Sequence, residues 1–174
     1  MFESANLPHK VDKAVYRREE PKLREALLNA QYDLKEDGRF PVLILIAGVE
    51  GAGKGESVNL LNEWMDPRHI QVRGFAEPSD EQIERPRMWR YWRALPLKGR
   101  IGIFFGAWHT QHILDRVQGR ISGVAFDRHI AEMLRFERML CDEGVVLLKV
   151  GRLRTRGLRH GRPDFDRHRA VDIG

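Results

Sequence analysis

The sequence predicts an α/β protein with three layers, in which helices cover both faces of a parallel sheet. Short apolar runs of strand length alternate with longer segments that have helical periodicity. The first apolar run, Val42 to Ile46, leads directly into a glycine-rich turn, and a helical segment follows from Ser57. A single domain is expected, because 174 residues with 42% hydrophobic content suit one core.

A phosphate-binding loop is predicted between this first strand and the helix that follows. Residues 48–54, GVEGAGK, match the pattern G-x-x-x-x-G-K in its strand-turn-helix context. Glycines let backbone N–H groups point into one concavity, the helix N-terminus is positive, and Lys54 adds a point charge. The expected phosphate-binding residues are Gly48, Gly51, Ala52, Gly53, Lys54 and Gly55.

The loop departs from the general pattern at one position. Gly55 stands where a Ser or Thr hydroxyl would contact Mg²⁺, so a metal must be held in some other way. The segment could also be a plain glycine turn between a strand and a helix. We favour a phosphate loop, and with it a P-loop NTPase-like fold, because strand, turn and helix occur in the required order.

The other elements follow from periodicity, caps and turns. An amphipathic helix weakened at Pro21 is expected over residues 12–34. Ser79 and Gln82 form a capping box at a helix start, and a longer helix is expected over residues 126–140. Further strands are expected at residues 70–75, 101–105 and 145–148.

The segment from Pro86 to Pro96 mixes aromatic residues with arginines and has two interpretations. Trp89, Arg90 and Tyr91 could belong to an aromatic and basic wall beside a phosphate chain or a base. Alternatively, the segment is a half-buried helix whose arginines are solvated.

The third expected strand ends without an acidic residue. A Walker B carboxylate is expected at the carboxyl end of a strand that faces the phosphate loop, but Phe105 and Gly106 occupy this place. His109 and His112 lie three residues apart on an expected helix, which could indicate a metal pair. No third ligand stands nearby in the sequence.

Composition and charge limit the classes of function. No apolar run reaches the length of a transmembrane helix, and the first residues lack the apolar core of a signal peptide. The single cysteine, Cys141, excludes an internal disulfide framework, so a cytoplasmic protein without membrane contact is expected. The net charge is +5, of which residues 151–174 supply +4 through seven Arg against three Asp, and nothing in this balance indicates nucleic acid.

The sequence changes character at Gly151. Residues 151–174 contain Arg but no Lys and show little periodicity, so we expect a poorly ordered, arginine-rich tail after a domain of residues 1–150. Such a tail could bind polyanions. It could also be the product of a shifted reading frame in a GC-rich gene, which would give arginine without lysine.

The order of these blocks resembles the polyphosphate kinase type 2 family, in particular the amino-terminal half of its tandem-domain polyphosphate:AMP phosphotransferases. The resemblance covers residues 10–149. The family's loop, G-x-D-x-x-G-K-x-G, stands here as GVEGAGKGE. The later blocks are FAEPSDEQ at 75–82, WRY at 89–91, LPLKG at 95–99, FFGAWH at 104–109, FERML at 136–140 and LLK at 147–149.

The resemblance implies phosphoryl transfer between inorganic polyphosphate and a nucleoside mono- or diphosphate with Mg²⁺, which needs charge neutralisation and in-line positioning. It assigns phosphate binding to Lys54, a metal contact through water to Glu50, and a positive wall to Arg90. Phe105 and Gly106 occupy the positions of the family's Asp-Arg pair. A metal ligand and a phosphate-binding guanidinium are therefore missing, and the metal site stays unassigned.

Family members continue after the last expected strand with helices that the tail does not match. We therefore interpret the chain as a truncated or frame-shifted amino-terminal domain, incomplete at the C-terminus, weak or inactive alone, and associating with a second homologous domain or with itself. One alternative is an active enzyme that uses Glu50 and Asp127 as substitute metal ligands. Others are a non-catalytic phosphate-binding domain of a tandem enzyme and a generic P-loop nucleoside kinase, which Gly55 disfavours.

Overall fold

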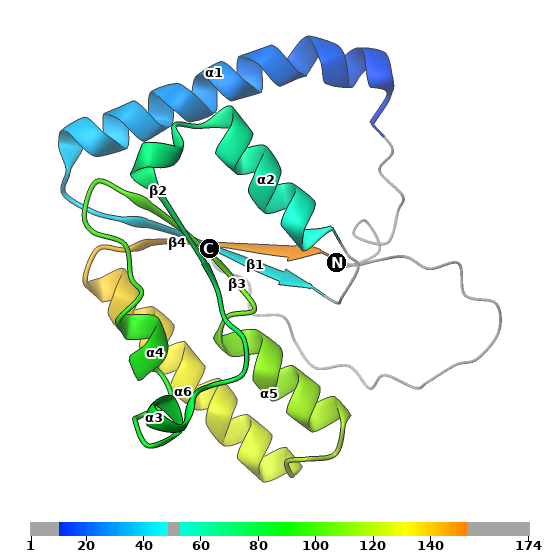
Figure 1. Ribbon diagram of the computed structural model, residues 1–174, viewed down its shortest axis with the longest axis vertical. Coiled ribbons are helices and arrows are strands. Elements are labelled where there is room, and N and C mark those ends of the chain that lie inside the picture. The colour runs from blue at the N-terminus through cyan, green and yellow to red at the C-terminus, as the bar shows by residue number, and fades with distance from the viewer. Residues whose placement is uncertain (1–10, 49–52, 153–174) are drawn as a thin grey trace, which may run out of the picture.

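A four-stranded parallel sheet forms the centre of the computed structural model, which describes residues 11–48 and 53–152 (Figure 1). The predicted strand positions are confirmed, and the spatial order is β2-β3-β1-β4. The last strand continues two residues past the predicted domain boundary at residue 150 and pairs with the end of the first strand. The strands are β1 (Val42–Gly48), β2 (Ile70–Gly74), β3 (Ile101–Phe105) and β4 (Val146–Arg152).

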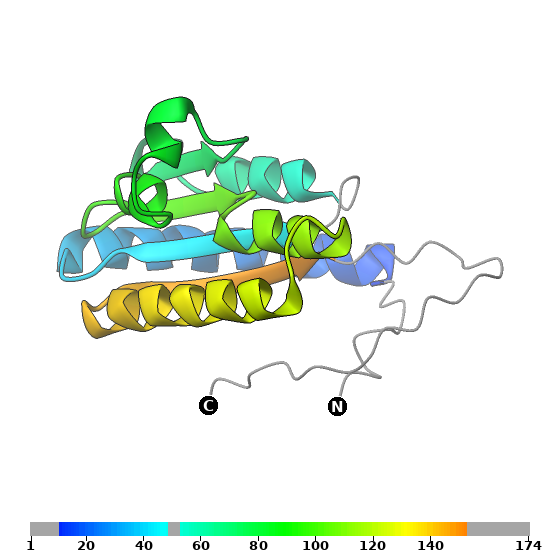
Figure 2. The same cartoon turned by 90° about the horizontal axis from the view of Figure 1, so that it is seen from below.

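Helices cover both faces of the sheet, which confirms the predicted three layers (Figures 1 and 2). One face carries α1 (Lys13–Asp37) and α2 (Lys54–Trp64). The other carries α4 (Trp89–Trp92), α5 (Trp108–Val117) and α6 (Gly123–Asp142), with the short α3 (Asp80–Ile83) beside them. In the described ranges, none of these helices has both the length and the apolar character that crossing a membrane requires.

Two local predictions about helices have different outcomes. The helix α1 runs without interruption through Pro21, where the sequence predicted a weak point. Ser79 caps α3, and the capping box with Gln82 is present as predicted. The first result shows that proline in the first half of a long helix does not end it here.

The alternating side chains of the strands divide the core between the two faces. Leu43 and Leu45 of β1 pack with Phe104 and the residues of α5 and α6. Ile46 points to the opposite face and packs with Ile103 and the residues of α1 and α2. This period of two, with apolar residues on both sides, explains the continuous apolar run of β1.

The free side of β4 is only partly covered by the described residues. Val146, Leu148 and Val150 are 41, 47 and 42% exposed on the face that carries α1. A cavity of about 450 Å³ lies between this part of the sheet and α1, lined by Leu27 and Phe40 among others. Exposed apolar side chains of this kind mark a surface that another element could cover.

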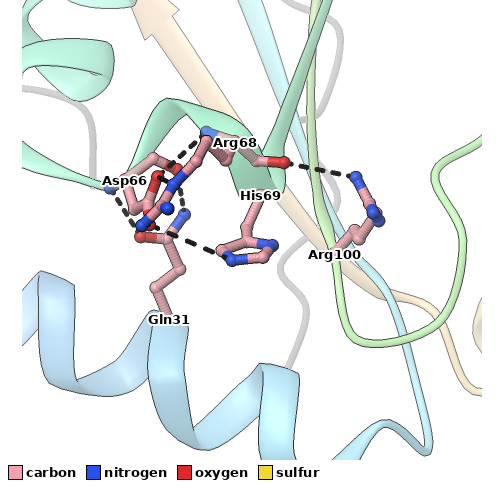
Figure 3. A network of polar contacts seen from close by, with 5 residues as sticks. All are labelled: Gln31, Asp66, Arg68, His69 and Arg100. Carbon is pink, nitrogen blue, oxygen red and sulfur yellow. Dashed lines mark hydrogen bonds and ion pairs between the residues drawn. The ribbon is translucent and has the colours of Figure 1, made fainter.

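A polar network fixes α1 to the turn before β2, a 3-10 helix η2 (Pro67–His69) (Figure 3). The Gln31 amide donates to the Asp66 carbonyl at 2.9 Å and accepts from the Asp66 N–H at 2.7 Å. The Asp66 carboxylate accepts from the Arg68 side chain, whose contact lowers the pKa of Asp66 to about 2. Arg100 donates to the Arg68 carbonyl at 3.3 Å and so adds the start of β3 to this network.

Candidate functional site

The predicted phosphate loop connects β1 to α2 at the carboxyl ends of the strands. Gly53 has φ +79°, a conformation that glycine adopts without strain, and it begins α2 at Lys54. The Lys54 ammonium donates to the Gly48 carbonyl at 2.8 Å, so it lies at the carboxyl end of β1. The N-terminus of α2 follows directly, and the first N–H groups of a helix have no partner within the helix and give this end a partial positive charge.

Part of this loop lies outside the described residues. The predictions for Glu50, Gly51 and Ala52 fall in the undescribed range 49–52. Gly55 lies on the exposed side of α2, where a Cβ atom would meet nothing within 4 Å. A larger residue would therefore fit at position 55 without displacing its neighbours.

A cavity of about 670 Å³ opens beside β2 and β3, at the same carboxyl edge as the loop. The segment after β2 forms one wall, and α5 and α6 form the other. Its volume lies within the range of sites for small ligands. Its charged and polar lining includes Glu77, Arg85, Arg87, Arg90, His112, Asp115 and His129.

Arg90 is held against the wall of this cavity. Its Nη2 donates to the Ala76 carbonyl at 2.8 Å, and its guanidinium carbon lies 5.4 Å from the centre of the Phe75 ring and 5.5 Å from that of Tyr91. Its Nε is buried and has no hydrogen-bond partner among the described residues. The guanidinium is thus positioned by aromatic rings beside the cavity.

The segment from Pro86 to Pro96 was interpreted either as an aromatic and basic wall or as a half-buried helix, and each interpretation describes part of the structure. Only Trp89–Trp92 is helical, and within it Tyr91 is buried while Trp92 is exposed. Arg85 and Arg93 lie over the Trp89 ring, at 5.4 and 4.8 Å from its centre. The segment therefore forms an aromatic and basic wall whose aromatic part is half buried.

The carboxyl end of β3 is occupied by an apolar ring and a tight turn. The Phe105 ring lies against Gly74 of β2, where a Cβ atom would come within 2.6 Å of the ring. Gly106 has φ +65°, and a Cβ atom there would lie 2.8 Å from the Phe75 carbonyl oxygen. These two positions thus offer neither a carboxylate nor a guanidinium to the cavity.

The described residues do not form a metal site by themselves. No three His, Cys, Asp or Glu side chains in the described ranges are grouped so that they could hold a metal ion. His109 contacts Glu137 and the His112 ring packs at a tilt beside His129, so the alternative of a metal pair gains no third ligand among the described residues. Asp127 is exposed on α6 and does not line the cavity.

A buried carboxylate on α6 organises the region behind the site, and no role was predicted for it from the sequence. Glu137 of α6 is 6% exposed and accepts from Trp108 Nε1 at 3.0 Å, His109 Nε2 at 2.9 Å and Lys149 Nζ at 2.5 Å. Burial raises its pKa, but the contacts with His109, Lys149 and Trp108 outweigh burial and lower the pKa of Glu137 to about 2. The sequence signal that could have identified this carboxylate is the position of Glu137 among the apolar residues that recur at helical spacing.

Two histidines in the cavity wall were also not predicted as a pair. The His112 and His129 rings lie 4.5 Å apart at 44°, and Arg87 contacts His129 Nε2. Burial is the main cause that lowers the pKa of both imidazoles, and the positive Arg87 adds to it. Both rings are therefore neutral at physiological pH.

Comparisons with known proteins agree on one family. The family described as Polyphosphate kinase 2 (PPK2) matches residues 10–151. A Pseudomonas aeruginosa protein named polyphosphate:AMP phosphotransferase is 59% identical over 149 residues, 86% of this chain and 30% of its own length. A relative of the same name from Acinetobacter johnsonii is 32% identical over 136 residues, 78% of this chain and 28% of its own.

Solved structures show the same similarity. A crystal structure from Pseudomonas aeruginosa assigned to polyphosphate kinase 2 superposes with a TM-score of 0.84 at 57% identity, covering 88% of this chain and 33% of that chain. Polyphosphate kinase 2 from Arthrobacter aurescens gives a TM-score of 0.76 at 25% identity, covering 82% of this chain and 52% of that chain. The chain spans about 30% of the length of the Pseudomonas aeruginosa relative.

Proposed function

Because this chain belongs to the polyphosphate kinase 2 family, we propose that it is a domain for phosphoryl transfer between inorganic polyphosphate and a nucleoside mono- or diphosphate. The relatives that are named polyphosphate:AMP phosphotransferase support this choice of substrates. Lys54 and the loop residues Gly48, Gly51, Ala52, Gly53 and Gly55 bind the polyphosphate chain. The acceptor nucleotide occupies the 670 Å³ cavity, with Arg90 as its positive wall.

One observation carries this proposal: a cationic side chain and a nucleotide-sized cavity lie at the same carboxyl ends of the strands. The Lys54 ammonium lies at the carboxyl end of β1, and the cavity lies at the carboxyl ends of β2 and β3. In parallel α/β sheets, ligands bind outside the carboxyl ends of the strands. Two phosphate-bearing substrates bound there would meet near the loop, as in-line transfer requires.

Magnesium belongs to the proposed reaction as an expectation from the family. When bound, the ion would supply positive charge that neutralises the negative charge developing during transfer. The described side chains do not fit a complete magnesium site, because Phe105 cannot ligate and no other group of three candidate ligands is present in the described ranges. Glu50 remains our proposed metal contact, and it lies outside those ranges.

A second candidate function is a non-catalytic phosphate-binding domain that supports a catalytic partner. Phe105 and Gly106 favour it, since both stand where the family resemblance implies charged residues. The two candidates share the phosphate loop and differ in turnover. They are therefore separated by activity and not by binding.

Calorimetry with polyphosphate tests the function that both candidates share. Lys54→Ala is expected to lower affinity by about 10- to 100-fold, because a charged hydrogen bond contributes about 1.5–3 kcal/mol. Lys35→Ala, which removes an exposed lysine from the end of α1, is the matched control and should bind as the wild type does. Equal affinity of the wild type and Lys54→Ala at low and at physiological salt would disprove the assigned role of the loop.

A further inference from the structure

The histidine pair in the cavity wall contains hydrogen-bonding atoms that the described protein leaves unused. His129 is 7% exposed, and its Nδ1 has no partner among the described residues. The same holds for Nδ1 of His112, whose ring centre lies 4.5 Å from that of His129. A buried polar atom without a partner costs about 1–3 kcal/mol, so such atoms in a cavity wall indicate a missing ligand.

The contact with Arg87 determines where the proton of His129 lies. A guanidinium carries only donors, so the Nε2 atom that faces Arg87 must be the acceptor. The neutral imidazole then carries its proton on Nδ1. His129 consequently presents a buried N–H donor that needs an acceptor.

The surroundings of this donor suit a neutral, flat ligand. Arginines 87 and 128 and the acids Asp115 and Glu132 are the charged groups that act on His129, and their charges are balanced in number. The apolar side chains of Ile83, Leu114 and Ile121 line the same cavity. A heteroaromatic base offers an apolar face to such side chains and ring nitrogen or carbonyl acceptors to an N–H donor.

The histidine pair lies along the cavity at a place where the base of a nucleotide could bind. Gly106 and Arg90 line the part next to the strand ends, whereas Leu114 and Ile121 belong to the far end of α5 and the turn after it. His112 lies between these two parts on α5. A nucleotide whose phosphates face the loop would thus bring its base toward the histidine pair.

We propose that His129 recognises the base of the acceptor nucleotide. Its Nδ1–H donates to a ring nitrogen or carbonyl oxygen of the base, and the His112 ring packs against the His129 imidazole. Arg87 acts through His129, because it fixes the tautomer that presents the proton. This inference rests on the proposed function, since it assumes that the cavity holds a nucleotide. It adds a specificity-determining residue that the sequence blocks did not indicate.

Two variants separate the two nitrogens of His129. An Asn amide nitrogen can replace the donor at Nδ1, whereas a Gln amide reaches the place of Nε2 and retains a partner for Arg87. His129→Gln is therefore expected to bind adenosine about tenfold more weakly than the wild type, and His129→Asn should retain most of the affinity. The matched control is His69→Gln in η2, which precedes β2 and lies at the amino ends of the strands, away from the cavity.

Titration calorimetry with adenosine, which has no phosphate, measures this contact directly, and thermal melts check that each variant is folded. Tripolyphosphate binding should be the same in the wild type and both His129 variants. Adenosine affinity that is unchanged in His129→Gln, or no adenosine binding by the wild type, would overturn the inference. An unchanged tripolyphosphate affinity in Lys54→Ala would instead overturn the proposed function and leave the adenosine result standing.

Discussion

At the scale of single residues, Glu137 shows how one buried carboxylate can join three elements. It lies on α6 and accepts hydrogen bonds from Trp108 and His109 at the start of α5 and from Lys149 in β4. A buried charge is tolerated only when it is paired and hydrogen-bonded, and here three donors meet one carboxylate. The network fixes the start of α5, which follows the turn at the cavity mouth.

This environment predicts a specific dependence of stability on pH. The pKa of Glu137 is lowered from 4.5 to about 2, so its ionised form is stabilised by folding. The contribution is complete above about pH 4.5 and is lost as the pH falls toward 2. Glu137→Gln should lower the free energy of unfolding at pH 7 by about 2 kcal/mol or more, with a smaller deficit at pH 3.

Urea unfolding at both pH values measures this difference. Glu143→Gln, which changes an exposed acid just after α6, should follow the wild type at both. A deficit of Glu137→Gln that stays constant between pH 7 and pH 3 would contradict the assigned ionisation.

At the scale of elements, the turn from β3 to α5 explains why glycine occupies position 106. Gly106 combines φ +65° with a close approach to the Phe75 carbonyl oxygen, whereas Gly119 has φ +71° and open space around it. Gly119→Ala should cost about 1 kcal/mol from backbone strain alone. Gly106→Ala should cost at least about 1 kcal/mol more, because its Cβ atom must displace the carbonyl.

Chemical denaturation of the two variants gives both values under the same conditions. Equal losses of stability would show that the loop after β2 moves away at no cost. In that case, the larger residue that the family resemblance implies at position 106 would also fit there.

The link between α1 and η2 is a second element-scale prediction. Gln31 is 2% exposed and contacts both backbone groups of Asp66, so Gln31→Ala leaves the Asp66 N–H without a partner among the described residues, while the Asp66 carbonyl keeps the His69 N–H at 3.1 Å. A loss of about 1–3 kcal/mol in the free energy of unfolding is expected. Asn29→Ala, on the exposed side of the same helix, should change it by less than about 0.5 kcal/mol. Similar losses for both would mean that helix propensity, and not this contact, determines the result.

Elements with strong local signals were predicted from the sequence, and contacts between distant segments were not. The apolar run of β1 and the capping box at Ser79 depend on neighbouring residues, so pattern and spacing suffice to identify them. The order of the strands and the contact between Arg87 and His129 join residues far apart in the chain. Such contacts depend on how helices pack on the sheet, and no local pattern specifies them.

At the scale of the whole molecule, the fold is that of the family, while the described site lacks charges that the chemistry needs. The described sheet and helices superpose on solved polyphosphate kinase 2 structures with TM-scores of 0.84 and 0.76. The fold is therefore compatible with the binding proposed for the loop and the cavity. Turnover depends in addition on groups placed where negative charge spreads during transfer.

We therefore predict that this chain, purified alone, transfers phosphoryl groups between polyphosphate and AMP or ADP only very slowly. Phe105 packs its ring on Gly74 and cannot ligate a metal, and Gly106 supplies no guanidinium. Losing one preorganised electrostatic partner costs about 100-fold or more in rate, and here two are absent. The expected rate is thus about 10⁴-fold or more below that of a full-length relative assayed in parallel, if the two losses act independently.

A coupled assay with AMP, ADP, polyphosphate and Mg²⁺ or Mn²⁺ measures this rate, with Lys54→Ala as the control for contaminating kinases. A slow rate that Lys54→Ala does not change would come from such a contaminant and would agree with the prediction. Rapid turnover that Lys54→Ala abolishes would contradict it. That result would mean that Glu50, Asp127 or another carboxylate holds the metal, and that the apolar end of β3 is compatible with catalysis because the charge is supplied from the loop side of the site.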